Sequence, residues 1–109
     1  MKELQLLQGT LDLLVLRALN RGPRYGYQIA ANIQRGSRQA FRVLDGALYA
    51  SLHRLEERGW VTSERGRAEN GKAVRFYALT QQGRARYRME ATTWIRYVTS
   101  VARVFEHCT

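Results

Sequence analysis

The sequence has one cysteine, one proline and two histidines among its 109 residues. Because Cys108 has no second cysteine to pair with, an internal disulfide is excluded, which suits a reducing cytoplasm. The adjacent His107 and Cys108 cannot by themselves close a zinc site, so we expect no metal. The sequence also lacks a recognisable Ser, His and Asp arrangement and a glycine-rich phosphate loop. We therefore expect neither an enzyme nor a bound cofactor.

Long apolar stretches are missing as well. Runs such as Leu13 to Leu16 are four residues long, far too short for a membrane-spanning helix. The first residues, MKELQLLQGTLDLL, are interrupted by Gln8 and Asp12, which argues against a signal peptide. These features predict a cytoplasmic protein that does not engage a membrane.

Negative charge is scarce. The chain has 18 basic and 9 acidic residues, a net charge of +9, and 16 of the basic residues are arginine, the side chain best suited to bidentate phosphate contacts. Residues 24–88 hold 13 basic and 5 acidic groups, a net +8, whereas residues 1–23 carry +1 and residues 89–109 carry zero. This distribution predicts a polyanionic partner that binds the middle of the chain.

The remaining composition is that of an ordinary folded domain, with 45% hydrophobic and 25% charged residues. A chain of this length predicts one domain with a modest core, which a partner could complete. Apolar residues at positions 4, 7, 11, 14 and 18 predict a first helix with Thr10 as its N-cap and Asp12 in its first turn, ending at the NRGP segment.

Two further helices are predicted before residue 60. The second runs from about Tyr25 to Gly36 and turns Ile29, Ala30 and Ile33 inward. The third occupies DGALYASLHRLEERGW, with Asp45 as its cap, Gly59 at its end and an inner face of Leu48, Leu52 and Leu55.

After Gly59 the pattern changes to that of a β-hairpin. The segments WVTSER and AVRFYAL are rich in β-branched and aromatic residues and predict two strands. Asn70 and Gly71 either form a two-residue turn or lie inside a longer loop. Thr80 is then placed to cap a last helix that runs to Arg103 or beyond.

The last helix carries a heptad pattern of apolar residues over three heptads, which we call the seam: Tyr87, Ala91, Trp94, Val98, Val101, Phe105 and Cys108. A repeat of this kind on a segment without net charge favours packing against another helix, and in a small domain a second copy of the chain is the natural partner. We expect the homodimer interface to contain the seam and three N-terminal residues, Leu4, Leu7 and Leu11.

The order of elements predicts a mainly α fold with a two-stranded β-hairpin wing, that is, a winged helix-turn-helix in residues 1–80 followed by a dimerisation helix in residues 81–109. The third helix is then the recognition helix, which reads the major groove of DNA. Its outer side starts with Gly46, Ala47 and Ala50, which lets the backbone approach DNA closely. Alternatively, Gly46 and Ala50 pack against a neighbouring loop.

Longer side chains are expected to complete the DNA contacts. On the third helix these are Tyr49, His53 and Arg54; Arg54 contacts a phosphate, reads guanine or pairs with an acid on its own helix, and His53 contacts DNA or is solvated. Arg65, Arg67, Lys72 and Arg75 of the hairpin hold phosphates, enter the minor groove or are solvated. Tyr25 and Tyr27 are each placed either on phosphate or in the core.

Trp94 has two interpretations. It is either plain packing in the helix interface or part of an aromatic pocket between two copies of the helix, where a small planar effector could stack.

Four segments, GTLDLLVLRAL, YGYQIAANI, GALYASLHRLEERGWV and GKAVRFYALTQQG, together resemble the PadR-like transcriptional regulators. The resemblance runs from about Gly9 to the terminal helix. It implies a winged helix-turn-helix, a homodimer formed by the C-terminal helix, binding to inverted-repeat promoter DNA, and repression relieved by a small molecule. Because the chain has one C-terminal helix, it resembles the short members, in some of which aromatic residues near Trp94 line a cavity for planar compounds.

Position by position, the resemblance places Tyr49 in the family's recognition helix, and Tyr25 and Gly26 at the start of the second helix. It places Arg75 and Tyr77 in the basic-aromatic second wing strand, where we expect both to contact DNA. Ala50 replaces a proline that many members have, and Ala73 lies in a wing segment that is often more basic. These departures leave the implied fold unaffected but weaken any transfer of the DNA target sequence. The sequence thus predicts a dimeric, double-stranded-DNA-binding repressor; the alternatives are an adaptor whose basic face binds an acidic protein and a binder of structured RNA.

Overall fold

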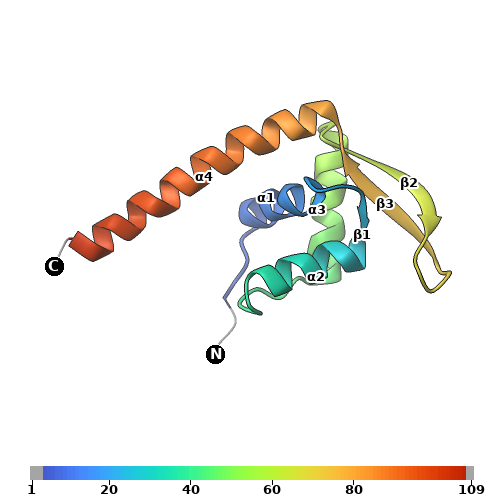
Figure 1. The fold of residues 1–109 in the computed structure, drawn as a ribbon, viewed down its shortest axis with the longest axis horizontal. Helices are drawn as coiled ribbons and strands as arrows, with labels where there is room; N and C mark the ends of the chain where they lie inside the picture. Colours follow the sequence, from blue (N-terminus) through green and yellow to red (C-terminus); the bar gives the residue numbers. More distant parts are fainter. Residues whose placement is uncertain (1–3, 108–109) are drawn as a thin grey trace.

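The structure, a computed structural model, describes residues 4–107 of the chain. The elements follow the order α1 (Gln8–Leu19), β1 (Arg24–Tyr25), α2 (Gly26–Gly36), α3 (Asp45–Glu57), β2 (Val61–Arg67), β3 (Ala73–Leu79) and α4 (Gln81–His107). Three short helices are followed by a projecting hairpin and one long helix, which confirms the predicted winged helix-turn-helix architecture (Figure 1). Cys108, the last predicted seam residue, lies outside the described residues.

The core lies where α1, α2 and α3 meet the base of the hairpin. Its most deeply buried side chains include Leu16, Ile29, Leu48, Leu52 and Leu55. Within α3, Leu48, Leu52 and Leu55 recur three or four residues apart, which places them on one helical face. The predicted inner faces of α2 and α3 are confirmed, with Ala30 partly buried and packed against the core.

Helix α1 begins before its predicted cap. Leu7 is the N-cap, without a side-chain hydrogen bond, so Thr10 lies inside the helix and its predicted capping role was wrong. Leu4 precedes the helix in an extended segment, where its backbone N–H donates to the carbonyl of Ala40 at 2.8 Å. Leu11 is only 3% exposed because it lies in the core of its own chain. Its predicted place in the dimer interface was therefore wrong.

The hairpin is part of a three-stranded sheet in the order β1-β3-β2. Strand β1 pairs antiparallel with β3, with Arg24 opposite Tyr77 and Tyr25 opposite Phe76. The predicted two-stranded wing therefore lacked one strand, because two residues are too few to show a strand periodicity.

The hairpin loop spans residues 68–72 between the paired Arg67 and Ala73. Gly71 adopts a left-handed conformation with φ 83°, and the loop closes by a hydrogen bond from the Ala68 N–H to the Lys72 carbonyl at 2.9 Å. Of the two alternatives for Asn70 and Gly71, the longer loop is the one observed.

The caps of α3 and α4 follow two different patterns. Leu44 is the N-cap of α3, so Asp45 is its first helical residue rather than its cap. Gly59 ends α3 with φ 78°, as predicted. The hydroxyl of Thr80 accepts the N–H of Gly83 at 3.0 Å, which confirms that Thr80 caps α4.

Helix α4 starts tightly against the turn between α3 and β2 and then leaves the body. A Cβ on Gly83 would collide with the backbone carbonyl of Trp60. The guanidinium groups of Arg58 and Arg86 both lie over the Trp60 ring, at 5.2 and 5.0 Å from its centroid. Beyond its contact with α1, α4 projects away from the other elements (Figure 1). None of the described helices combines the length and apolarity that crossing a membrane requires.

Candidate nucleic-acid interface

The outer face of α3 is open. Gly46, Ala47 and Ala50 are exposed, and a Cβ built on Gly46 would meet no atom within 4 Å. The opposite face is anchored in the core by Leu48 and Leu52. The alternative in which Gly46 and Ala50 pack against a loop was therefore wrong. The first turns of α3 present a nearly bare backbone to the surroundings.

Tyr49 connects this face to the start of α2. The residue is half exposed, and its hydroxyl lies so close to Gly26 that a Cβ there would collide with the Tyr49 ring. Gly26 is the first residue of α2. The absence of a side chain at Gly26 thus lets the two helices of the helix-turn-helix meet through Tyr49.

The two tyrosines near the start of α2 differ in their surroundings. Tyr27 is 76% exposed and free to reach a phosphate. Tyr25 packs its ring edge-on against Phe76 of the hairpin at 5.5 Å, and its backbone N–H donates to the Gln28 side chain at 3.2 Å. Of the two, Tyr27 is the better candidate for a DNA contact.

Arg54 is held within the protein. Its Nη2 donates to Asp12 Oδ1 at 2.7 Å and its Nε to Asp12 Oδ2 at 3.2 Å, while the Ser51 hydroxyl donates to the same carboxylate at 2.6 Å. These hydrogen bonds raise the pKa of the Arg54 guanidinium. The predicted pairing of Arg54 with an acid of its own helix was wrong, because the acid belongs to α1. A contact of Arg54 with a phosphate or a guanine requires this pair to open and stays a prediction. No sequence spacing could have found the pair, because α1 and α3 meet only through the fold.

His53 remains on the exposed face of α3, where its Nε2 lies 3.1 Å from Glu57 Oε1. An exposed pair of this kind is weak and can open to a phosphate. The DNA contact of His53 therefore stays a prediction.

The wing directs its arginines toward the side of α3. Cross-strand partners share a face of the sheet, and so do residues two positions apart in one strand. Ser63 pairs with Tyr77, and Arg65, two positions further along β2, pairs with Arg75. Arg65 and Arg75 therefore share the face that carries Ser63 and Tyr77. Ser63 donates to Glu56 of α3 at 2.7 Å, so this face borders α3.

Arg65 and Arg75 are exposed and directly opposite one another. Like charges in this arrangement repel, and a phosphate between them would remove the repulsion. Arg75 also donates to Ser63 at 3.1 Å and Arg67 to the Gly71 carbonyl at 2.9 Å, which orders both side chains. Lys72 lies exposed in the loop.

Tyr77 points into the core and is only 7% exposed. Burial, followed by the nearby charge of Glu56, raises the pKa of its phenol. Its predicted DNA contact was wrong, because strand alternation turns position 77 inward at the base of the wing.

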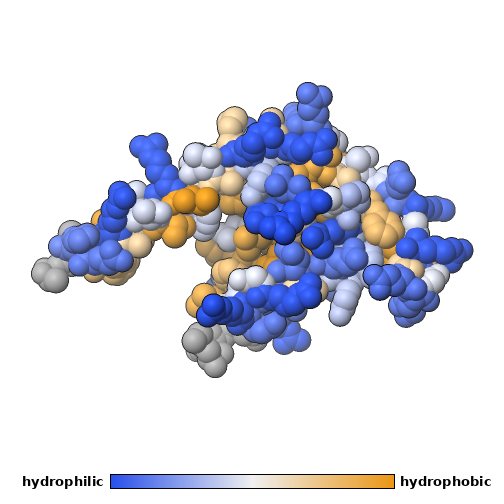
Figure 2. Space-filling view, in the orientation of Figure 1, coloured by the Kyte–Doolittle hydropathy of each residue, from blue (hydrophilic) through white to orange (hydrophobic). Residues whose placement is uncertain are grey.

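The seam of α4 divides into two parts. Tyr87 packs against the core of the same chain and Ala91 is half-buried, so the predicted interface role of Tyr87 conflicts with its packing. Trp94, Val98, Val101 and Phe105 are exposed, Phe105 to 83%. Figure 2 shows apolar side chains along the projecting part of α4.

A hollow of about 800 Å³ lies between the start of α1 and α4. Leu7 and Leu13 line it from α1 and its N-cap, and Met89, Trp94 and Tyr97 from α4. The rings of Trp94 and Tyr97 stack with centroids 5.9 Å apart. Leu4, three residues before Leu7 in the sequence, is also exposed. It lines a different hollow, whose lining includes Ala47. Within residues 4–107 no group of three or more His, Cys, Asp or Glu is placed to hold a metal ion.

Comparison with known proteins gives consistent matches. The model of the transcriptional regulator PadR-like family matches residues 15–89. The chain is 30% identical over 80 residues to the uncharacterized protein X of Lysinibacillus sphaericus, covering 73% of each chain. It is 49% identical over 49 residues to the transcriptional regulator Rv3488 of Mycobacterium tuberculosis, covering 45% of each. The crystal structure of a PadR family transcription regulator from Clostridium difficile is similar with a TM-score of 0.71 and 27% identity, covering 87% of this chain and 96% of that one.

Proposed function

The chain belongs to the PadR-like family of transcriptional regulators, and we propose that it is a cytoplasmic homodimeric repressor of inverted-repeat promoters that a small planar effector releases. As a family member it is a DNA-binding transcription regulator and not an enzyme. The observation that carries the proposal is the pairing of an open, nearly bare face on α3 with arginines on the adjoining face of the wing.

The bare face of α3 suits entry into a major groove. Ala47 and Ala50 allow the helix backbone to approach base edges, and His53 one turn later can reach a base or a phosphate. Arg65 and Arg75 would hold the DNA backbone beside the groove, and Tyr27 would hold it at the start of α2. Phosphate contacts position the protein, and the few side chains on α3 supply the sequence preference.

The projecting half of α4 supports the homodimer. Val98, Val101 and Phe105 form an apolar strip that the described part of the protomer leaves uncovered. Pairing with the same strip of a second chain buries it and sets two recognition helices at a fixed spacing, which matches an inverted repeat. In such a dimer, Leu4 and Leu7 lie at the N-terminal margin of the interface.

The hollow beside Trp94 supports the effector. Its volume of about 800 Å³ is in the range of small-molecule sites. Trp94 and Tyr97 offer flat apolar surfaces on which a planar compound can stack. Binding there would change how α4 packs on α1 and hence the spacing of the two recognition helices.

Selection of genomic fragments by the purified protein tests the function. Enrichment of one palindromic sequence is expected, and its absence would contradict the proposal. Competition against the selected duplex by structured RNA and by an acidic polymer distinguishes DNA recognition from an RNA binder or an adaptor for acidic proteins. If the acidic polymer competes as well as the duplex, the adaptor function is favoured.

A substitution on α3 tests the observation itself. Ala50→Leu adds bulk to the open face and should weaken binding to the selected duplex at least about tenfold, because the backbone can no longer approach the bases. Ala85→Leu makes the same change at an exposed position of α4 and should leave affinity unchanged. Equal affinities for both variants would exclude α3 as the recognition helix.

A further inference from the structure

Another hollow lies between α1 and α2, with a lining that shares no residue with the hollow beside Trp94 or with the residues proposed to contact DNA. It has a volume of about 700 Å³, and Leu14, Ala18, Ile33 and Phe41 supply the apolar part of its lining. None of its lining residues comes from α3, the hairpin or α4. A molecule bound there would therefore leave the recognition helix and the wing uncovered.

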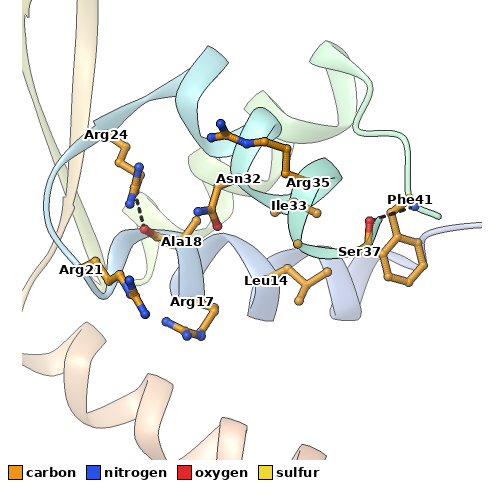
Figure 3. Close-up of a pocket in the computed structure, with 11 residues that line it drawn as sticks. Leu14, Arg17, Ala18, Arg21, Arg24, Asn32, Ile33, Arg35, Ser37 and Phe41 are labelled. Carbon is orange, nitrogen blue, oxygen red and sulfur yellow. Dashed lines mark hydrogen bonds between the residues drawn. The ribbon is translucent and has the colours of Figure 1, made fainter. Parts of the chain in front are cut away.

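Four arginines surround this hollow. Arg17 and Arg21 approach it from the last turn of α1 and the segment that follows, and Arg24 and Arg35 from β1 and α2 (Figure 3). The Nε of Arg24 donates to the Ala18 carbonyl at 2.8 Å, which fixes its side chain at the edge of the hollow. The Asn32 amide lies between the two groups of arginines and adds a neutral donor and acceptor.

The positive charge of this cluster is not balanced within residues 4–107. The lining contains no aspartate or glutamate, and the ion pairs of the described residues involve other arginines. Four guanidinium groups around one hollow repel each other. A bound anion would be attracted to all four and would offset their mutual repulsion. Arginine forks also match the oxygens of a phosphate in a bidentate manner.

We propose that this hollow is a binding site for a small organic polyphosphate, a molecule of the size and chemistry of a nucleoside di- or triphosphate. Its volume is that of a small-molecule site and too small for a macromolecule. Arginines on both sides favour more than one phosphate group. The apolar lining around Phe41 suits a planar or apolar body attached to the phosphates.

Calorimetric titration of the full chain tests the site with three probes: inorganic pyrophosphate, ATP and adenosine. Pyrophosphate and ATP should bind with one site per chain, ATP more tightly because its base reaches the apolar lining, and adenosine should give no saturable binding. Absence of saturable binding by both pyrophosphate and ATP would overturn the proposal.

A pair of charge-matched variants separates a built site from general attraction to a basic protein. Arg17→Gln with Arg35→Gln should weaken ATP binding at least about tenfold. Arg96→Gln with Arg103→Gln removes the same charge from exposed positions of α4 on the side away from the seam and should retain the affinity. Equal weakening in both double variants would overturn the proposal.

The DNA affinity of the same double variant tests the other anion that these arginines could bind, which is the DNA backbone. If the Arg17 and Arg35 variant loses affinity for DNA while the parent chain binds no ATP, these arginines contact DNA flanking the operator and the proposal is wrong. All the substituted side chains are exposed, so the variants should fold. If circular dichroism shows that the double variant is unfolded, the single substitution Arg21→Gln repeats the test. It should weaken ATP binding to a smaller extent.

Discussion

Asp12 of α1 and Arg54 of α3 form a bidentate ion pair, with Nη2 to Oδ1 at 2.7 Å and Nε to Oδ2 at 3.2 Å. The two side chains are only 14% and 25% exposed. Because Ser51 also donates to Asp12, two consecutive turns of α3 are tied to one carboxylate. This contact fixes the rotation of α3 about its axis and thereby directs its bare face outward.

Asp12→Asn should lower the free energy of unfolding by about 2 kcal/mol, because it removes the charge that compensates the half-buried Arg54. Urea denaturation measures the change. Glu90→Gln is the matched control, since it weakens the exposed pair of Arg86 with Glu90 and should cost less than about 1 kcal/mol. Losses of the same size would show that the Asp12 contact has no special structural role.

Alanine at two glycines in the first turns of helices should have opposite effects. Gly83→Ala should destabilise the chain by about 1–3 kcal/mol, because the new Cβ meets the Trp60 carbonyl and the backbone must move. Gly46→Ala should be neutral or stabilise by up to about 1 kcal/mol, since its Cβ meets nothing. Thermal unfolding of both variants checks the pair, and a stable Gly83→Ala would contradict the close approach of α4 to Trp60.

Tyr77 should make the chain less stable at alkaline pH. Burial raises the pKa of its phenol above the ordinary value of 10.0, so the unfolded chain loses this proton at a lower pH than the folded one. Its contribution is fully present below about pH 10 and is lost as the pH rises through the folded pKa, with a slope of at most about 1.4 kcal/mol per pH unit. Tyr77→Phe should reduce the loss of stability above about pH 10 in denaturant titrations. An identical pH profile for both proteins would contradict the burial of this hydroxyl.

The wing arginines should determine the salt dependence of DNA binding. Replacing Arg65 and Arg75 by alanine should weaken binding to all sequences alike and reduce the slope of log K against log salt by about two, one for each phosphate contact. Mobility shifts over a salt series measure the slope. Alanine at Arg96 and Arg103 on α4 should leave it unchanged. A loss confined to one base position would show instead that a wing arginine reads sequence.

The seam should hold two chains together. Val98→Glu places a charge in the apolar strip of α4 and should yield a monomer or an aggregate by light scattering, because an unpaired charge is costly in an apolar interface. Thr99→Glu adds the same charge at the neighbouring exposed position and should preserve the dimer. A dimer mass for Val98→Glu would remove the seam from the interface.

Much of the architecture was predictable from local patterns. These patterns depend on residues near each other in sequence: the helical spacing of apolar residues in α2 and α3, the β-branched and aromatic residues of the hairpin strands, and the capping of α4 by Thr80. The open face of α3 followed from its small residues for the same reason. The division into residues 1–80 and 81–109 and the DNA-contacting roles of Tyr27, Ala47 and His53 stay predictions.

What the sequence determined by itself was the four helices and the two hairpin strands, their order, and the excess of arginine, because periodicity, capping and charge are properties of neighbouring residues. Only the tertiary structure decided which side chains meet across long separations. It paired Arg54 with Asp12, turned Tyr77 into the core, covered Leu11, added β1 to the sheet and gathered four arginines around one hollow. Such contacts depend on how helices and strands pack in three dimensions, and no spacing along the chain encodes that packing.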